Sequence, residues 1–469
     1  MKTKIIVKIL LIIQIIVQTG CASQKITQTE QIYLPDNYIV ASDSTTIAAI
    51  RWMDFFSDTH LQEYIRTALN NNYSYTVALE RVNQARLVLL QSKMAYLPQL
   101  DAGVSAGIQR FGEYHMDGIG NRESSTPIPD PYRDFNLGLR FGWELNVAGK
   151  LKHQKRAALA RYMASEEALN YTRSLLVCEV ATIYYELIGL DKRQTIYSRY
   201  IESLNASLSL SRELVAEGFE TSLAAEQFET KILSLQSIIL WEKHEISVKE
   251  RALAVLLGGL PIEFVRMDFE QANVLNYPVQ TGLPAQIIRY RPDIREAELQ
   301  LQASKLDVAV AHAAFFPSIV IGGGGEFNSF ELSKWFKTPA SFVYDIAAGL
   351  TAPIFRQREI RTLWENAKSE QRIALKNYHQ QVISAYAEVL DVLSEIKTTE
   401  SMQQLKYKEV AIYHRSQESA TELFKLDFAG YLEVLSVMEK SLEAELEYAH
   451  ISTSHAITHI LLYRSLGGG

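Results

Sequence analysis

A twelve-position hydrophobic ladder constrains the fold of this chain more than any other feature of its sequence. Its spacing alternates between four and three residues without a slip, and ten of the twelve positions are apolar. A mean period of 3.5 residues is typical of a coiled-coil helix. Because no Pro or Gly-rich break interrupts residues 157–215, we expect a helix on the order of 90 Å long. The ladder consists of Leu176, Val180, Ile183, Leu187, Leu190, Gln194, Tyr197, Ile201, Leu204, Leu208, Ser211 and Val215.

The chain contains two further ladders of the same kind, over residues 375–396 and 435–463. Such stripes are explained by ordinary helix packing, and we interpret them as the wall of a structure rather than as a site.

The order of elements repeats once along the chain. Tyr96-Leu97-Pro98-Gln99 and Phe315-Phe316-Pro317-Ser318 each end a predicted helix and open a strand, and they lie 219 residues apart. A segment rich in Gly and Pro, residues 258–292, separates the two halves. The pattern predicts a first repeat over 55–270, with a helix, strands at about 99–112 and 134–147, and long helices at about 156–215 and 222–257. It predicts a second repeat over 271–469, with a helix at about 293–315, strands at about 318–328 and 342–354, and long helices at about 359–425 and 431–464.

The four predicted strands alternate between apolar and polar residues. In one of them Phe135, Leu137 and Leu139 alternate with Asn136 and Gly138. This period fits a membrane barrel with an apolar outer face, and it also fits a soluble antiparallel sheet over a core. A closed membrane barrel needs at least about eight strands, and an open edge cannot lie in lipid. A membrane reading therefore requires several chains to share one barrel, and two or three chains both satisfy this requirement.

The N-terminus has the pattern of an export signal. Three lysines precede a short apolar run from Ile9 to Val17, which predicts a signal peptide over residues 1–20. Gln18-Thr19-Gly20-Cys21 follows and looks like a bacterial lipobox, so Cys21 is the expected lipid anchor of an N-terminal extension over 21–54. The alternative is an ordinary signal peptide with an incidental cysteine. No later segment has 18 uncharged apolar residues, so we expect no transmembrane helix in the mature chain.

Several motifs carry a resemblance to a known family. The most specific is Gly282–Glu298, which contains Arg291-Pro292-Asp293, and Trp143-Glu144-Leu145 and the ending Leu461–Gly469 agree with it. The chain resembles the outer-membrane efflux proteins of the TolC superfamily, in the OprM-like or NodT-like lipoprotein branch. The resemblance covers nearly the whole mature chain, and Tyr290 departs from it because the family more often has Arg there.

The resemblance implies a mostly α-helical fold with a membrane β-barrel and two structural repeats per chain. The long helices would form a periplasmic α-barrel, and four strands per chain would contribute to a trimeric 12-stranded β-barrel. It further implies a passive exit duct of a tripartite efflux pump in the outer membrane of a Gram-negative-type bacterium. Its partners would be two further copies of itself, a periplasmic adaptor, an RND-type inner-membrane transporter and outer-membrane lipid.

The resemblance also assigns roles to individual residues. The helix tips that contact an adaptor would carry Gly218, Phe219, Thr221, Phe428 and Gly430, with Gly218 and Gly430 supplying flexible turns. The periplasmic aperture would be lined by Phe424, Asp427 and Glu433, where acids repeated around an axis make a cation-selective constriction. The two acids are equally well explained as solvated helix-end charges.

The motif Arg291-Pro292-Asp293 is also predicted to start a helix. Pro292 should force Arg291 into an extended conformation. Asp293 should then cap the following helix, with Glu296 completing a capping box.

The sequence shows no constellation typical of an enzyme. His455 and His459 are four residues apart, but no Glu follows His455, so the pair is not an HExxH zinc site. Gly322–Gly325 lacks a following Gly-Lys-Ser/Thr and is expected to supply small lumen-facing strand residues. Cys178 is expected to be a small buried hydrophobe. No Lys/Arg cluster stands out, which argues against nucleic acid.

We therefore predict no enzymatic activity, no metal and no cofactor other than covalent lipid on Cys21. The alternatives are a lipid-anchored coiled-coil scaffold, the outer-membrane duct of a type I protein secretion system, and a hydrolytic envelope enzyme.

Overall fold

The two halves of the chain are built from matching elements. The first contains α4 (Tyr73–Met94), β1 (Gln99–Gln109), β2 (Tyr132–Leu145), α6 (Lys150–Glu217) and α7 (Ser222–Leu256). The second contains α10 (Pro292–Ala313), β3 (Ser318–Ser329), β4 (Phe342–Thr351), α11 (Glu359–Lys425) and α12 (Tyr431–Ser465). The paired helices have nearly equal lengths, with 22 residues in α4 and α10, 68 and 67 in α6 and α11, and 35 in α7 and α12. The predicted repeat organisation is confirmed.

The computed structural model describes residues 35, 38, 46–125, 129–260, 264–272, 279–426 and 428–469. Contacts divide the chain into Met1–Pro35 and Asp36–Gly469, and every element named here belongs to the second unit. The predicted signal peptide, the lipobox with Cys21, and the predicted aperture residue Asp427 lie outside the described residues.

Short elements connect the long ones. The N-terminal extension contains η1 (Ile47–Ala49) and α2 (Trp52–Phe55), and α3 (Thr59–Asn71) precedes α4. Asn72 ends α3 and caps α4, because its Oδ1 accepts a hydrogen bond of 3.0 Å from Tyr75 N. The remaining elements are α5 (Met116–Glu123) between β1 and β2, η3 (Leu332–Lys334) between β3 and β4, and α8 (Phe269–Ala272), η2 (Pro284–Gln286) and α9 (Ile287–Tyr290) between the repeats.

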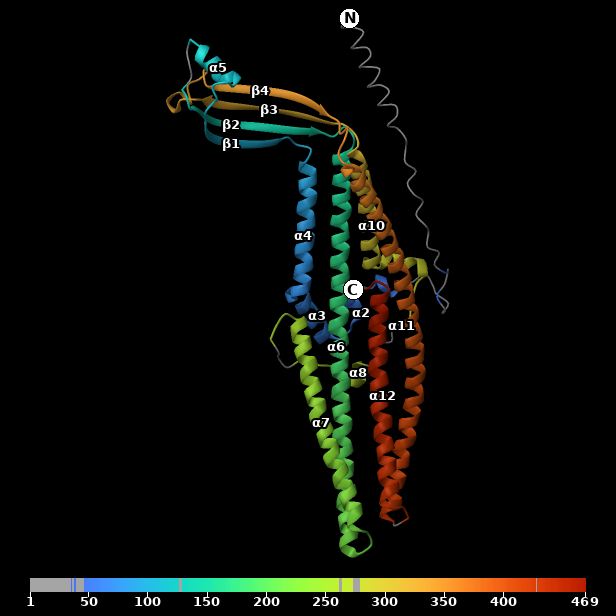
Figure 1. Cartoon of the computed structure of the whole chain (residues 1–469). Helices are drawn as coiled ribbons and strands as arrows, with labels where there is room; N and C mark the ends of the chain where they lie inside the picture. The colour runs from blue at the N-terminus through green and yellow to red at the C-terminus, as the bar shows by residue number, and fades with distance from the viewer. Residues whose placement is uncertain are drawn as a thin grey trace. The chain divides into compact units, whose positions relative to one another are not determined.

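The four long helices pack as two antiparallel pairs that lie against each other. α6 packs against α7, α11 packs against α12, and α6 and α12 join the pairs (Figure 1). The hydrophobic ladder forms much of these contacts, since Leu176, Val180, Leu187 and Leu204 are fully or almost fully buried. Within the ladder segment, position 189 is a glycine because the Thr453 side chain of α12 occupies the space that a Cβ atom would need. Among the described helices, none combines enough length and apolar character to cross a membrane.

The strands form one antiparallel sheet in the order β1-β2-β3-β4. Sequence neighbours are spatial neighbours throughout, although β2 and β3 belong to different repeats. Within the described chain β1 and β4 are the edges, and each has a partner on one side only.

Candidate functional site

The register of the sheet places most of the apolar residues of all four strands on one face, with Val320, Val343 and Ala347 on the other. Residues directly opposite each other in a ladder share a face. Leu100 pairs with Phe141, Phe141 with Gly323, and Gly323 with Ile346. The same rows continue through the other alternate positions, so the face carries Val104, Ala106, Leu137, Leu139, Trp143, Ile319, Ile321, Phe327, Phe342, Tyr344 and Leu350.

This apolar face is open. Every residue of β1 and of β4 is exposed, including Val104 at 70% and Ile346 at 78%. A soluble antiparallel sheet buries one face against a core. Within the described residues no core covers β1 or β4, in contrast to such a soluble sheet. An exposed apolar face of this extent marks contact with lipid or with another molecule.

The opposite face of the sheet is polar. It carries Asp101, Arg140, Glu326 and Asp345, and Arg140 Nη2 lies 4.0 Å from Asp345 Oδ1. The expectation that all four glycines of Gly322–Gly325 face a lumen is wrong for two of them. Gly322 and Gly324 lie on the polar face, whereas Gly323 and Gly325 lie on the apolar face, where the rings of Phe141 and Phe342 occupy the space that their side chains would take.

The two edge strands of the sheet limit most strongly which assemblies this chain can form. β1 and β4 each present a row of backbone N–H and C=O groups with no partner strand in the described chain. In lipid each unsatisfied group of this kind costs several kcal/mol, so an open edge is not tolerated there. In lipid, a sheet of this kind therefore requires further strands at both of its edges.

The tip between α6 and α7 has the turn that the sequence predicts. Gly218 ends α6 in the left-handed conformation at φ +81°, and its N–H and that of Phe219 bond to the carbonyls of Val215 and Leu214. Thr221 precedes α7 without a side-chain cap. Phe219 is 69% exposed, so this tip presents an apolar ring to solvent.

The tip between α11 and α12 is built differently. Gly430 has φ −82° and an extended backbone, so this turn does not use the left-handed conformation that Gly218 adopts. Phe428 is 79% exposed. The two tips therefore share an exposed phenylalanine rather than a turn geometry.

Gly218→Ala should lower tip stability by about 1 kcal/mol, because a residue with a Cβ atom is strained at positive φ. No neighbouring atom lies within 4 Å of the added Cβ position, so strain alone acts. Faster amide hydrogen exchange in residues 211–226 would report the loss. Gly430→Ala is the matched control, since any residue adopts its backbone conformation and the one close atom, Glu433 Oε2 at 2.8 Å from the added Cβ, is the end of a flexible side chain. Equal effects of the two variants would contradict the assignment.

The predicted aperture residues have different environments. Phe424 lies in the last turn of α11 and is only 3% exposed. Glu433 is exposed in the first turn of α12, where a carboxylate is favoured by the helix dipole. The aperture roles of both residues stay predictions, and only Glu433 has a side chain free to face an opening.

The predicted structural motif forms a buried ionic cluster. Arg291 is 5% exposed and contacts Asp293 through two hydrogen bonds, of 3.0 Å from Nε and 2.7 Å from Nη2. Its Nη1 donates to Glu388 Oε2 at 2.7 Å and to the Ser465 carbonyl at 2.9 Å. Burial opposes the charge, but the bonds and charges of Asp293 and Glu388 outweigh it and raise the pKa of Arg291. The cluster joins α10, α11 and the end of α12.

The predicted capping box does not form. The helix α10 begins at Pro292, its N-cap is Arg291, and no side chain caps it. Asp293 instead accepts hydrogen bonds from Arg291 and from Gln381 Nε2 at 2.6 Å. The backbone N–H of Ile294 also donates to Asp293 Oδ1 at 2.9 Å, but the guanidinium bonds to both carboxylate oxygens, because a buried charge needs an opposite charge. Glu388 and Arg464, which pair at 2.9 Å, complete the cluster, and no local pattern marked either residue.

The two histidines of α12 contact each other. His459 Nε2 lies 3.3 Å from His455 Nε2, and His455 Nδ1 lies 2.9 Å from Thr399 Oγ1. Burial first and His455 second lower the pKa of His459 to about 4, so its imidazole is neutral at pH 7. The part of the chain that the structure describes contains no group of three or more His, Cys, Asp or Glu side chains able to hold a metal ion.

The prediction for Cys178 is confirmed. It is 2% exposed, and burial raises the pKa of its thiol to about 12.

Known proteins share this architecture. The family model described as outer membrane efflux protein matches residues 64–259 and 283–468. SilC of Salmonella typhimurium, named a probable outer membrane lipoprotein, is 27% identical over 468 residues, which cover 98% of each chain. The cation efflux system protein CusC of Escherichia coli strain K12 is 26% identical over 456 residues, covering 96% of this chain and 97% of that protein.

The fold is similar to solved structures as well. A crystal structure of CusC, from work on folding and transmembrane channel formation, has a TM-score of 0.83 at 25% identity and covers 96% of this chain and 100% of that one. The outer-membrane channel OprN has a TM-score of 0.82 at 23% identity, covering 94% of this chain and 98% of that one.

Proposed function

Because this chain belongs to the outer membrane efflux protein family, we propose that it is the outer-membrane exit duct of a tripartite efflux pump. It conducts substrates passively and catalyses no reaction. The open apolar face of the four-stranded sheet, with its two unpaired edges, is the observation that carries this proposal.

Three chains form the duct. β4 of one copy pairs with β1 of the next, which closes a barrel of twelve strands and leaves no edge in lipid. The apolar rows then face lipid, and Asp101, Arg140 and Glu326 face the lumen, as in outer-membrane barrels. The long helices of the three copies extend the duct into the periplasm.

An adaptor protein grips the helix tips and links the duct to an inner-membrane transporter of the RND type. The exposed rings of Phe219 and Phe428 support this role, because exposed aromatic side chains act as anchors at protein interfaces. The alternative function, a coiled-coil scaffold without a pore, does not explain a sheet whose apolar face is exposed. Lipid on Cys21 anchors the N-terminus in the outer membrane.

Native mass spectrometry of the full-length protein, extracted from membranes in mild detergent, tests the proposal. We expect the mass of three chains, each starting at a lipid-modified Cys21. A monomer under mild extraction would refute the shared barrel, and a lipid-free N-terminus would refute the anchor alone.

Glu433→Gln should weaken closure of the duct and its block by multivalent cations. A unit charge about 4 Å from a cation is worth about 1 kcal/mol in water. Each of the three copies loses one charge, so block should weaken by roughly fivefold for every lost charge that lies this close to the bound cation. Single-channel recordings in planar bilayers with a multivalent cation at the tip side would measure both effects. Glu395→Gln is the control, because Glu395 is an exposed residue within α11, well before its tip. Unchanged conductance and block would place Glu433 among ordinary helix-end charges.

A further inference from the structure

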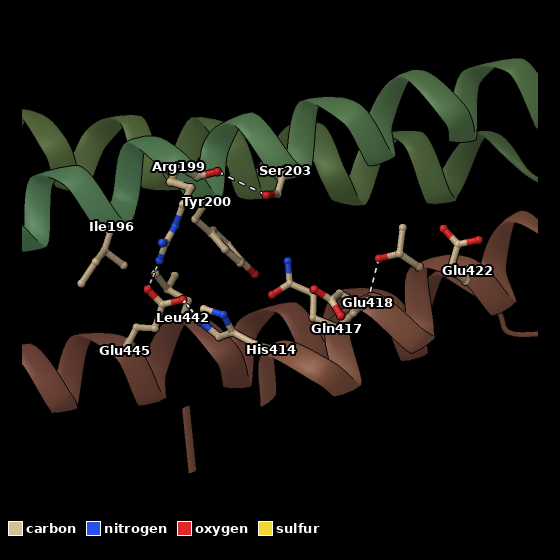
Figure 2. Close-up of a pocket in the computed structure, with 11 residues that line it drawn as sticks. Ile196, Arg199, Tyr200, Ser203, His414, Gln417, Glu418, Glu422, Leu442 and Glu445 are labelled. Atoms are coloured by element: carbon tan, nitrogen blue, oxygen red, sulfur yellow. Dashed lines mark hydrogen bonds and ion pairs between the residues drawn. The ribbon is translucent and has the colours of Figure 1, made fainter. Parts of the chain in front are cut away.

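A pocket of about 560 Å³ lies between the two helix pairs, away from the sheet, and reaches Glu422 in the last turn of α11. α6 forms one side of it, and α11 and α12 form the other (Figure 2). Its polar lining comprises Arg199 and Tyr200 of α6, Gln417, Glu418 and Glu422 of α11, and Glu445 of α12.

Most charges around the pocket already have partners. Arg199 forms an ion pair with Glu445, and His414 Nε2 lies 2.6 Å from the other oxygen of the same carboxylate. Glu422 pairs with Lys425 at 2.8 Å on the exposed surface. Within the described ranges, Glu418 is the lining carboxylate without a cationic partner.

Tyr200 supplies a second unmatched group. Its side chain is only 6% exposed, and its hydroxyl has no hydrogen-bond partner among the described residues. Figure 2 shows the ring reaching from α6 toward Gln417 and Glu418. Burial first and the charge of Glu439 second raise the pKa of Tyr200, so the phenol stays protonated and can accept one hydrogen bond while donating another. A buried polar group without a partner is rare in folded proteins.

The unmatched groups define the ligand chemistry. The Glu418 carboxylate, the Tyr200 phenol oxygen and the side-chain oxygen of Gln417 are all acceptors, so a ligand with N–H donors and a positive charge matches them. No three of the described carboxylates and imidazoles come together as metal ligands, so a metal ion is a poor match. An alkylammonium group has the required charge and three donors.

Glu418 and Glu422 extend the site along α11. Residues four apart lie on the same helix face, about 5–6 Å from each other. This spacing suits the two ends of a short aliphatic diamine, and the exposed pair of Glu422 with Lys425 can exchange for a ligand ammonium. The pocket volume is within the range of small-ligand sites, about 300–1,000 Å³.

We propose that this pocket binds a small aliphatic di- or polyamine, with one ammonium group held by Glu418 and Tyr200 and the next by Glu422. The site goes beyond conduction through the duct, since it lies at the seam between helix pairs of one chain. A bound amine bridges α6 and α11 and stabilises the arrangement of the two pairs.

Isothermal titration calorimetry of the purified full-length protein in detergent, with spermidine at low ionic strength, tests the proposal. We expect saturable binding of one spermidine per chain. Glu418→Gln should weaken binding at least about tenfold, and Tyr200→Phe about threefold, through loss of a charge-assisted and a neutral hydrogen bond. Glu370→Gln is the matched control, because it removes an equal charge from an exposed residue of α11 outside the pocket. The affinity of Glu370→Gln for spermidine should equal that of the wild type.

Tyr200→Phe is also the variant that should fold as stably as the wild type. It removes a hydroxyl that has no partner among the described residues. The thermal midpoint without spermidine should therefore not fall, whereas the midpoint increase caused by spermidine should shrink. Three results would overturn the proposal: no saturable binding to the wild type, the same loss of affinity in Glu370→Gln as in Glu418→Gln, or Mg²⁺ binding as tightly as spermidine through Glu418. Conductance of the same samples reports on the duct separately, so failure of the amine site leaves the channel function to its own test.

Discussion

Ile346→Lys should abolish trimers in the outer membrane, whereas Ala347→Lys, one residue along the same strand, should leave them intact. Ile346 lies on the apolar face near the middle of β4 and is 78% exposed. A lysine facing lipid at the bilayer midplane costs about 2–4 kcal/mol. The cost is incurred in all three copies, so roughly three times that amount opposes one barrel.

The control differs only in the face of the sheet. Ala347 pairs with Gly322 on the polar face, on the same side as Asp345. A lysine there enters an aqueous lumen close to carboxylates and should cost little. The fraction of protein in the outer membrane and the proportion of trimer in native mass spectrometry measure both variants. Equal amounts of trimer in the two variants would mean that the apolar face does not contact lipid.

Arg291→Met should destabilise the chain by about 3–5 kcal/mol, as expected when one partner of a buried ion pair is removed. The loss leaves Asp293 buried at 8% exposure with only Gln381 and a backbone N–H as donors. It also removes one of the two arginines that hold Glu388. The midpoint of thermal unfolding, followed by circular dichroism in detergent, should fall accordingly.

Arg295→Met provides the comparison for Arg291→Met. Arg295 lies one turn further along α10 and pairs with Glu167 at 3.0 Å, but its side chain is 38% exposed. A partly exposed pair contributes up to about 1 kcal/mol, so this variant should change the midpoint much less. The double variant Arg291→Met with Asp293→Leu should recover part of the loss, because no unpaired Asp293 carboxylate stays buried. Equal effects of the two single variants would show that the cluster is not the joint between α10, α11 and α12.

Local features of the sequence determined the elements of this protein. The 3.5-residue ladder placed α6 to within a few residues, because side chains three and four apart share a helix face wherever the helix lies. Alternation of period two placed the four strands for the same kind of reason. Gly218 marked a helix end because its positive φ is a property of a single residue.

Only the tertiary structure decided how these elements face one another. Alternation within a strand does not set the phase between strands, since a slip of one residue moves every side chain to the other face. The registers of the sheet aligned all four apolar rows. The partners of Arg291 include Glu388 and Ser465, which lie 97 and 174 residues further along the chain.

These distant partners also explain where the sequence-based predictions were wrong. Asp293 was expected to cap α10, but a buried guanidinium took its carboxylate. The Tyr200 hydroxyl, which has no partner in the part of the chain that the structure describes, likewise depends on which helices surround it, because its position in α6 could equally have faced solvent. Sequence periodicity encodes which side of an element is apolar. The pairing of buried charges and polar groups depends on contacts between residues far apart in the chain, and these exist only once the helices have packed.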